Sequence, residues 1–281
     1  MKLSIIIPTV GRETLAEVLQ GIRACDGFEE IKPEVIVVFD GVGTCHGMSL
    51  PKIKILETGK ASGASVARNI GIENATGDVI AFLGDDTIPT KNWLREIYNF
   101  HTQHADENVV LLGKVSWTEK LSKDSFHQWL LNHAQFDYKN IKKHGPTWRH
   151  FYTSNISLKK SFIGKTKFPE DFEGWGFEDI AFGYELAQKD MWMWYDEKCE
   201  VLHDHEQTLE QVIKNTRNAR KNAEKFEKKY DMKILPRGGK LWLLKFALFL
   251  TLFFAPFSKK LRWWRAWKKA WIGFEIHRKF I

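Results

Sequence analysis

The sequence predicts an α/β fold in which an open, mainly parallel sheet is covered by helices on both faces. Short runs rich in Ile and Val alternate with helix-patterned segments over the first hundred residues. Each run ends at turn residues, as buried parallel strands do. The chain has 281 residues, of which 43% are hydrophobic, so it can bury one large core, or one core with an appendage.

The first predicted element is a strand over residues 3–7, whose apolar run meets a proline at once and is too short for a signal peptide. A helix over residues 14–24 follows, because apolar residues recur there at helical spacing. We expect the alternation to continue with strands over 34–39, 52–56 and 79–83 and a helix over 64–74.

The pattern is weaker after residue 83. We predict a helix from Pro89, with Thr90 as its cap, and a strand over 109–113. Residues 117–151 are rich in Trp, His and Phe with little periodicity, which indicates loops and short helices lining a binding surface. A helix from Glu178 and a strand ending near Leu202 complete this part.

Polar residues follow three of the predicted strands. Pro8 and Thr9 follow the first strand, Asp40 the second, and Asp85 with Asp86 the fourth. Ligands of open α/β sheets bind beyond the carboxyl ends of the strands. Adjacent carboxylates repel one another unless a cation or solvent offsets the repulsion, and oxygen ligands favour Mg²⁺ or Mn²⁺. The alternative interpretation is a solvated Asp-Asp turn before the next helix.

A second group of acidic residues opens a helix. Capping explains Glu178 and Asp179 at a first helical turn, since the helix dipole favours negative charge there. Capping does not explain Gly174, Trp175 and Gly176 directly before them. A Trp between two glycines is exposed by a flexible backbone, and its face can stack on a sugar ring.

Four segments together resemble glycosyltransferase family 2, of the GT-A fold, from Met1 to about His205. SIIIPTVGR resembles the opening strand and loop of that family, and VVFDG resembles its VDDGS motif. ASGASVARNIGIENATGDVIAFLGDD resembles its central block, and GWGFEDI the GWGxED acceptor motif of galactosyltransferase-like members. The chain departs from the family at Phe39 and Gly84, where other members carry the first Asp of DDGS and of DxD.

The resemblance implies three parts of the chain. Residues 1–110 form the donor-binding half, residues 111–205 the acceptor-binding and catalytic half, and residues 206–281 a helical, basic and aromatic tail. The implied sheet is the Rossmann-like sheet of nucleotide-diphospho-sugar transferases.

The resemblance also implies a nucleotide-sugar donor, with UDP as the expected nucleotide. Thr9 and Asp40 contact the base and ribose, and the Asp40 carboxylate accepts the uracil N–H. Arg68 lies near the base or the diphosphate, where a guanidinium suits anionic oxygens. Pro8 and Arg12 complete the donor-binding set.

Two aspartates and a histidine form the implied metal site. Asp85 holds the ribose and contributes to the site, while Asp86 binds Mn²⁺ or Mg²⁺ and so reaches the two phosphates. The third ligand is His203, with His205 as the alternative. An ordinary pair of loop histidines is the other interpretation.

The implied chemistry is transfer of the donor sugar to a saccharide acceptor with inversion. Asp179 is the general base and Glu178 orients the acceptor, which Trp175 and Gly176 bind. The expected products are surface polysaccharide or lipid-linked glycan. Two alternatives are a polyprenyl-phosphate sugar synthase and a non-catalytic sugar or nucleotide binder.

The end of the chain is strongly basic. Residues 240–281 carry ten of the 42 Lys and Arg residues and one of the 35 Asp and Glu residues. Residues 206–230 predict a polar helix and 236–239 a break. The apolar stretch 241–257 is short for a membrane span and contains Lys245, so the open alternatives are that it dips into a membrane, lies along it or packs on the body. In the last predicted helix the aromatic residues Trp263, Trp264, Trp267, Trp271 and Phe274 lie on one side, and Arg262, Arg265, Lys268 and Lys269 lie mostly on the other.

That arrangement is typical of an interfacial helix on an anionic membrane. A helix that covers the core or makes an oligomer is the alternative. No nucleic-acid-binding module is recognisable, so we expect no nucleic-acid partner. The three cysteines form no metal-ligand pattern, which suits a reducing compartment. We therefore expect a cytoplasmic enzyme held peripherally at the inner face of the cell membrane.

Overall fold

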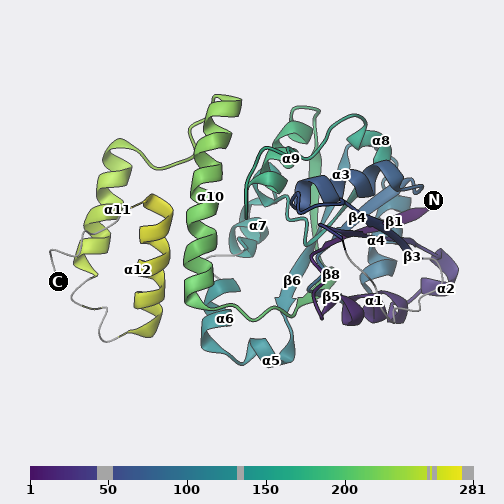
Figure 1. Ribbon diagram of the computed structural model, residues 1–281, viewed down its shortest axis with the longest axis horizontal. Helices are drawn as coiled ribbons and strands as arrows, with labels where there is room; N and C mark the ends of the chain where they lie inside the picture. Colours follow the sequence, from purple (N-terminus) through teal and green to yellow (C-terminus); the bar gives the residue numbers. More distant parts are fainter. Residues whose placement is uncertain (43–52, 132–135, 252–253, 255–257, 274–281) are drawn as a thin grey trace. The chain divides into compact units, whose positions relative to one another are not determined.

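The computed structural model describes residues 1–42, 53–131, 136–251, 254 and 258–273 (Figure 1). The chain forms two compact units. The sheet unit consists of Met1–Glu170 and Glu178–His205, and the helical unit consists of Asp171–Phe177 and Glu206–Ile281. Cys25 and Cys199 are buried free thiols, and Cys45 lies outside the described residues.

Within the described residues, the sheet has eight strands in the order β3-β2-β1-β4-β7-β6-β8-β5. Their bounds are β1 Leu3–Thr9, β2 Glu34–Phe39, β3 Ile53–Glu57, β4 Val79–Leu83, β5 Thr87–Pro89, β6 Val109–Trp117, β7 Asn155–Lys159 and β8 Trp192–His203. The predicted strand over 52–56 corresponds to β3, and residue 52 lies outside the described residues.

The expectation of a mainly parallel sheet is wrong, because the sheet is mixed. Strands β3, β2, β1 and β4 are parallel, as are β6 and β8. Strand β7 enters between β4 and β6 antiparallel to both, and β5 is antiparallel to β8. Ile156 and Leu158 of β7 are buried on one face, while the polar Asn155 and Ser157 are buried on the other.

Helices cover both faces of the sheet, as predicted. Because side chains alternate along a strand, Ile5 belongs to one buried cluster and Ile6 to the other. Helices α1 (Leu15–Ala24) and α4 (Trp93–Gln103) pack on the first face, and α3 (Ala64–Asn74) and α9 (Glu178–Ala187) on the second (Figure 1). The short helices are α2 Phe28–Ile31, α5 Glu119–Ser122, α6 Ser125–Leu130, α7 Tyr138–His144, η2 Trp148–His150 and α8 Lys160–Ile163.

The predicted helix start at Pro89 is wrong. Thr87, Ile88 and Pro89 form β5 and pair with β8, so α4 begins later, at Trp93. This short pairing sets His203 opposite Thr87, one residue after Asp86.

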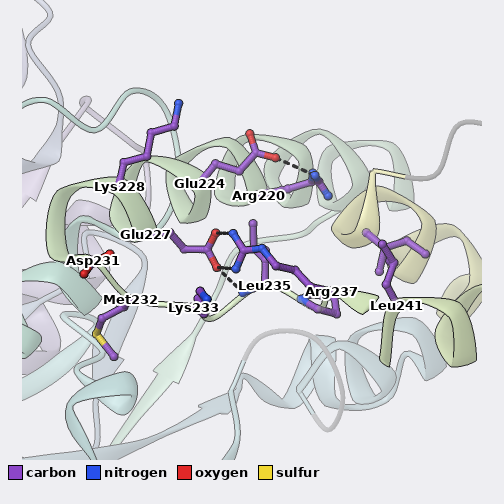
Figure 2. A pocket seen from close by; sticks show the side chains of 12 residues that line it. Arg220, Glu224, Glu227, Lys228, Asp231, Met232, Lys233, Leu235, Arg237 and Leu241 are labelled. Atoms are coloured by element: carbon purple, nitrogen blue, oxygen red, sulfur yellow. Dashed lines mark hydrogen bonds and ion pairs between the residues drawn. The ribbon is translucent and has the colours of Figure 1, made fainter. Parts of the chain in front are cut away.

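The helical unit contains α10 (Leu209–Tyr230), α11 (Gly238–Leu250) and α12 (Lys259–Ile272). Figure 2 shows how the turn after α10 is fixed: Glu227, which is buried, pairs with the Arg237 guanidinium. The Glu227 Oε1 atom also accepts the backbone N–H groups of Ile234 at 2.7 Å and Leu235 at 2.8 Å. In the described part of the chain, no helix is both long and apolar enough to cross a membrane.

Arg265, which was predicted on the basic side of the last helix, is buried in the structure. This arginine is 6% exposed and donates to the Leu248 carbonyl and, at 2.7 Å, to the Thr251 hydroxyl. It therefore ties α12 to the end of α11, where carbonyl groups lack helical partners. Phe274 lies outside the described residues.

Candidate active site

The carboxyl ends of β1 and β4 meet at one edge of the sheet, because the two strands are parallel neighbours. Thr9 ends β1, and its hydroxyl donates to Asp85 Oδ2 at 2.7 Å. Both residues are buried. Pro8 precedes Thr9 within β1 and pairs with Val38 of β2. This edge therefore holds a buried carboxylate directly after a buried strand.

Arg12 lies between the two adjacent aspartates. Its Nε atom is 3.1 Å from Asp85 Oδ1 and 3.8 Å from Asp86 Oδ2. The guanidinium offsets the repulsion between the carboxylates. Because the Arg12 side chain is 37% exposed, it can move when another cation or a ligand arrives.

The two carboxyl groups have different electrostatic surroundings. Burial raises the pKa of Asp85 above its ordinary value, against a hydrogen bond from Thr9 that lowers it. Burial also acts to raise the pKa of Asp86, but the hydrogen bond and charge of His203, with Arg12, bring that pKa below its ordinary value. Asp86 is therefore the more strongly anionic of the pair.

His203 is brought to Asp86 by the pairing of β5 with β8. Its Nε2 atom is 3.4 Å from Asp86 Oδ2, and the backbone N–H of Asp204 donates to the Asp86 carbonyl at 2.8 Å. The imidazole stacks on Trp117, with ring centroids 4.8 Å apart and planes 15° apart. His203 thus has a defined orientation.

His205 lies nearby, with its ring centroid 6.2 Å from that of His203. Its Nδ1 atom is 3.3 Å from Arg12 Nη1. Burial and the charge of Arg12 lower the pKa of His205. The neutral ring therefore faces a guanidinium, whereas the His203 ring faces a carboxylate.

The donor set suits a divalent cation shared with a phosphate ligand. Among the residues the structure describes, no three His, Cys, Asp or Glu side chains are grouped closely enough to hold a metal ion. Asp86 and His203 supply one carboxylate and one imidazole, and an ion with so few protein ligands takes the others from water and phosphate oxygens. The residues present fit such an ion.

Gly84 gives Asp86 its room. A Cβ atom added at Gly84 would lie 3.0 Å from Asp86 Oδ1 and 3.1 Å from Thr87 Oγ1. Any side chain at this position, including an aspartate, would press on the side chains of Asp86 and Thr87. Glycine in place of the first Asp of DxD therefore leaves space for the Asp86 carboxylate in its present position.

Asp40 closes the loop that leads into α3. Its Oδ1 atom accepts the backbone N–H groups of Ser62 at 2.6 Å and Gly63 at 3.0 Å, and Oδ2 also accepts from Gly63 at 3.0 Å. The Thr58 hydroxyl donates to the same carboxylate at 3.3 Å. The uracil contact stays a prediction, and Asp40 also has this structural role.

Arg68, Glu178 and Asp179 form a second group. Arg68 Nη1 lies 3.3 Å from Glu178 Oε1, and the Arg68 guanidinium lies over the Phe168 ring, 5.3 Å from its centroid. Arg68 Nε and Glu178 Oε2 are buried and have no hydrogen-bond partner among the described residues. Buried polar atoms rarely stay unpaired, so a ligand at this place would complete them.

Asp179 is partly buried at the start of α9, where its Oδ1 atom accepts the Ile180 N–H at 2.8 Å. Burial and the negative charge of Glu178 raise the pKa of Asp179 to about 7, against the opposing charge of Arg68. A carboxylate whose pKa is near neutral pH is suited to accept a proton.

Trp175 and Gly176 belong to the helical unit, whereas Glu178 and Asp179 belong to the sheet unit. The Trp175 side chain is 51% exposed, as its flanking glycines predict, and Gly176 has a φ of +94°.

Three supporting residues were missed from the sequence. The Thr14 hydroxyl donates to the Asp85 carbonyl at 2.8 Å, and Trp117 orients His203. Asn69 donates to the Phe168 carbonyl and to Glu170, both at 2.9 Å, and so holds the chain before the acidic group. Asn69 follows Arg68 in the central block, and Trp117 begins the aromatic region predicted to line a binding surface, so both carried some signal. Thr14 carried none.

A family model described as glycosyl transferase family 2 matches residues 4–164. Over 228 residues the chain is 23% identical to a chondroitin synthase of Pasteurella multocida, covering 66% of this chain and 23% of the relative. Over 267 residues it is 24% identical to a validoxylamine A glucosyltransferase of Streptomyces hygroscopicus, covering 81% of this chain and 56% of the relative. The chain thus spans only part of the length of both.

Two solved structures have a similar fold. The mannosyltransferase PcManGT of Pyrobaculum calidifontis, in complex with GDP-Man and Mn²⁺, has a TM-score of 0.66 and 16% identity, with 96% of this chain and 85% of that chain covered. TarS 1–349 of S. aureus, in complex with UDP, has a TM-score of 0.56 and 15% identity, with coverages of 99% and 93%.

Proposed function

Because the chain belongs to glycosyl transferase family 2 and has its GT-A-like α/β fold, we propose that it is an inverting transferase. In this proposal it moves a hexose from a UDP-sugar to a saccharide acceptor, with Mn²⁺ or Mg²⁺ as cofactor. The observation that carries the proposal is the position of Asp86 at the end of β4, with His203 3.4 Å away.

The donor end is built around Asp85 and Asp86. When bound there, a divalent ion supplies positive charge against the diphosphate leaving group. Asp86 and His203 hold that ion in the proposal, and Arg12 is free to turn from the aspartates toward phosphate oxygens. Thr9 holds the buried Asp85 carboxylate toward the ribose.

Asp179 is the proposed general base. An acceptor hydroxyl is a poor nucleophile, and a carboxylate within hydrogen-bond reach takes its proton as the new bond forms. In this proposal Glu178 accepts a second hydroxyl of the acceptor through its Oε2 atom, which is buried and has no hydrogen-bond partner among the described residues. A single base on the face opposite the leaving group gives inversion at the anomeric carbon.

The proposed acceptor is a saccharide of a surface polysaccharide or a lipid-linked glycan. Support comes from the exposed Trp175 and from the relative described as a chondroitin synthase. A polyprenyl-phosphate sugar synthase needs no such aromatic platform, so an assay supplying lipid phosphate as sole acceptor separates the two.

We further propose that the helical unit binds the anionic inner face of the cell membrane. Helix α11 and Phe254, which follows it, expose large apolar side chains. The rings of Trp242 and Phe246 stack with their centroids 5.4 Å apart. Lys240 and Lys245 of α11 and Lys259 of α12 are also exposed. The exposed apolar residues are Trp242, Leu243, Phe246, Phe249, Leu250 and Phe254.

In this proposal α11 contacts lipid more than α12 does. An amphipathic surface helix buries its apolar face in the acyl boundary, and each basic residue near anionic lipid adds about 1 kcal/mol. Trp263 and Trp267 of α12 are partly buried, which leaves less aromatic surface there for lipid.

The test of the transferase is a binding and turnover experiment. Calorimetry measures the affinity of wild type for UDP and for GDP, each with and without Mn²⁺. Sugar transfer and donor hydrolysis are then followed with UDP-glucose, UDP-galactose, UDP-glucuronate and the two UDP-N-acetylhexosamines. We expect UDP to bind only with metal, and Asp86→Ala to lose both binding and turnover. Metal-independent turnover that survives in Asp86→Ala contradicts the proposal, and binding without any turnover favours a non-catalytic binder.

A further inference from the structure

The seven residues Asp171–Phe177 lie in the middle of the chain but belong to the helical unit. They include Trp175 and end directly before Glu178 and Asp179. We call residues 171–177 the Trp175 loop. The elements that hold this loop come from the last third of the chain, although the residues that it precedes begin α9 of the sheet unit.

Asn222 of α10 makes the central contacts to the loop. Its side chain is buried, with 4% exposure, and its Nδ2 atom donates to the carbonyl oxygens of Glu173 at 3.0 Å and Gly176 at 2.8 Å. Both N–H groups of one amide are thus used on two carbonyls three residues apart. The backbone on either side of Trp175 is fixed by this single side chain.

The glycines on either side of Trp175 allow the loop to approach α10. A Cβ atom added at Gly174 would lie 3.0 Å from Asn218 Nδ2, and one added at Gly176 would lie 3.1 Å from the Ala219 Cβ atom. Both glycines also have positive φ, of +71° and +94°. The two glycines therefore let the loop backbone lie close to α10, and they also leave Trp175 exposed.

The two ends of the loop are held as well. Asp171 pairs with Lys229 at 3.4 Å and with Lys225 at 3.7 Å. Phe177 is 8% exposed and has a φ of +78°, a conformation that a bulky residue keeps only where its surroundings impose it. Its ring stacks on Trp271 of α12, with centroids 6.3 Å apart and planes 13° apart.

The loop backbone is therefore fixed while the Trp175 ring stays 51% exposed. We propose that Asn222 is a positioning residue for the acceptor: it holds Trp175 ready to stack on a sugar ring before the acceptor arrives. This inference rests on the proposed function. Preorganisation of this kind lowers the entropic cost of binding, because the loop need not become ordered on contact.

The experiment compares Asn222→Asp with wild type. The carboxylate has nearly the same shape as the amide but donates no hydrogen bond, so both loop contacts are lost and two carbonyls face a negative charge. Thr216→Ala is the matched control, since Thr216 is also a buried polar residue of α10 and its hydroxyl donates to the Val212 carbonyl of its own helix, at 2.7 Å. Asn222→Ala serves as the second variant if the aspartate impairs folding.

Two readouts are needed. Hydrogen–deuterium exchange of peptides covering 171–178 should become faster in the Asn222 variants and stay as in wild type in Thr216→Ala. With the UDP-sugar that wild type turns over, and chondroitin or maltodextrin oligosaccharides as acceptors, kcat/KM for the acceptor should fall about 10- to 100-fold. The Kd for UDP with Mn²⁺ should stay unchanged.

The inference is overturned if exchange in 171–178 does not change, or if UDP affinity falls together with transfer. Failure of the proposed function looks different, because wild type itself would then neither bind UDP nor transfer sugar.

Discussion

Arg68 Nη1 lies 3.3 Å from Glu178 Oε1, and this ion pair stands directly beside Asp179. The two members act on Asp179 in opposite directions: Glu178 raises its pKa and Arg68 lowers it. A buried helix arginine and an acidic residue 110 positions later thus set the proton affinity of the proposed base together.

The first prediction is that Asp179→Asn separates donor binding from transfer. The amide cannot take a proton, so transfer should fall by about 10²- to 10⁴-fold. The Kd for UDP with Mn²⁺, measured by calorimetry, should stay as in wild type. Loss of nucleotide binding in a folded variant would remove Asp179 from the role of base.

The second prediction concerns pH. The pKa of Asp179 is raised to about 7, so the basic form is lost as the pH falls through 7, and kcat/KM should fall with it. Glu178→Gln removes the negative charge that raises this pKa, so the acidic limb should move to lower pH. A pH profile of kcat/KM for donor and acceptor measures the shift, and an unmoved limb would contradict the assignment.

The third prediction concerns Gly84. Because an added Cβ would lie 3.0 Å from Asp86 Oδ1, Gly84→Ala should displace that carboxylate and weaken Mn²⁺-dependent UDP binding. Changes to the groups that orient a metal ligand typically cost about 10- to 100-fold in metal affinity, and we expect an effect of that order here. Gly59→Ala is the comparison, since no atom lies within 4 Å of an added Cβ there, although its φ of +78° strains the backbone. Equal Mn²⁺ affinity in Gly84→Ala and wild type would show that Asp86 is not a ligand.

The fourth prediction concerns stability at low pH. Burial, with the charge of Lys159, lowers the pKa of His101 to about 3. The unfolded chain takes up this proton below about pH 6.5 but the folded chain does not, so stability falls as the pH drops. The contribution is at most about 1.4 kcal/mol per pH unit for one group. Urea unfolding of His101→Gln between pH 7 and pH 4 should show a shallower decline than wild type.

The fifth prediction concerns membrane binding. Phe246→Ser with Phe249→Ser should abolish flotation with phosphatidylserine vesicles, because both side chains are exposed on α11. Trp194→Ser is the control, since Trp194 is an exposed aromatic residue of β8 in the sheet unit. Flotation should be weak on neutral vesicles for every variant. An equal loss of flotation in Trp194→Ser would show that exposed apolar residues in general, and not α11, cause the binding to vesicles.

Much of the first half of the sheet unit is predictable from sequence. Strands β2 and β4 and helix α3 have the predicted bounds, because their apolar residues form unbroken runs or helical stripes between clear turns. Strand β7 was missed because both of its faces are buried and one carries Asn155 and Ser157. Those polar residues are satisfied only by distant partners, including the Trp93 indole and His101.

In the site, too, residues next to clear strands were predictable, whereas contacts between distant segments were not. Asp85 and Asp86 were predicted because they follow a recognisable strand. The ion pair of Arg12 with both aspartates was not predicted, and neither was the stacking of His203 on Trp117. The stacking depends on the pairing of β6 with β8, which sets Trp117 opposite His203. The approach of His203 to Asp86 depends on the short pairing of β5 with β8, which is hard to predict because β5 has three residues and contains Pro89.

The contacts of the Trp175 loop also set an order for folding during synthesis. The ribosome makes residues 171–177 well before Asn222 and Trp271, which later bind the carbonyls and the ring of this loop. The last strand of the sheet unit, β8, ends at His203, so this unit is complete before α10 has been made. The loop then stays without its partners until α10 and α12 have been translated. A chain that ends before residue 209 would therefore lack the contacts that hold Trp175.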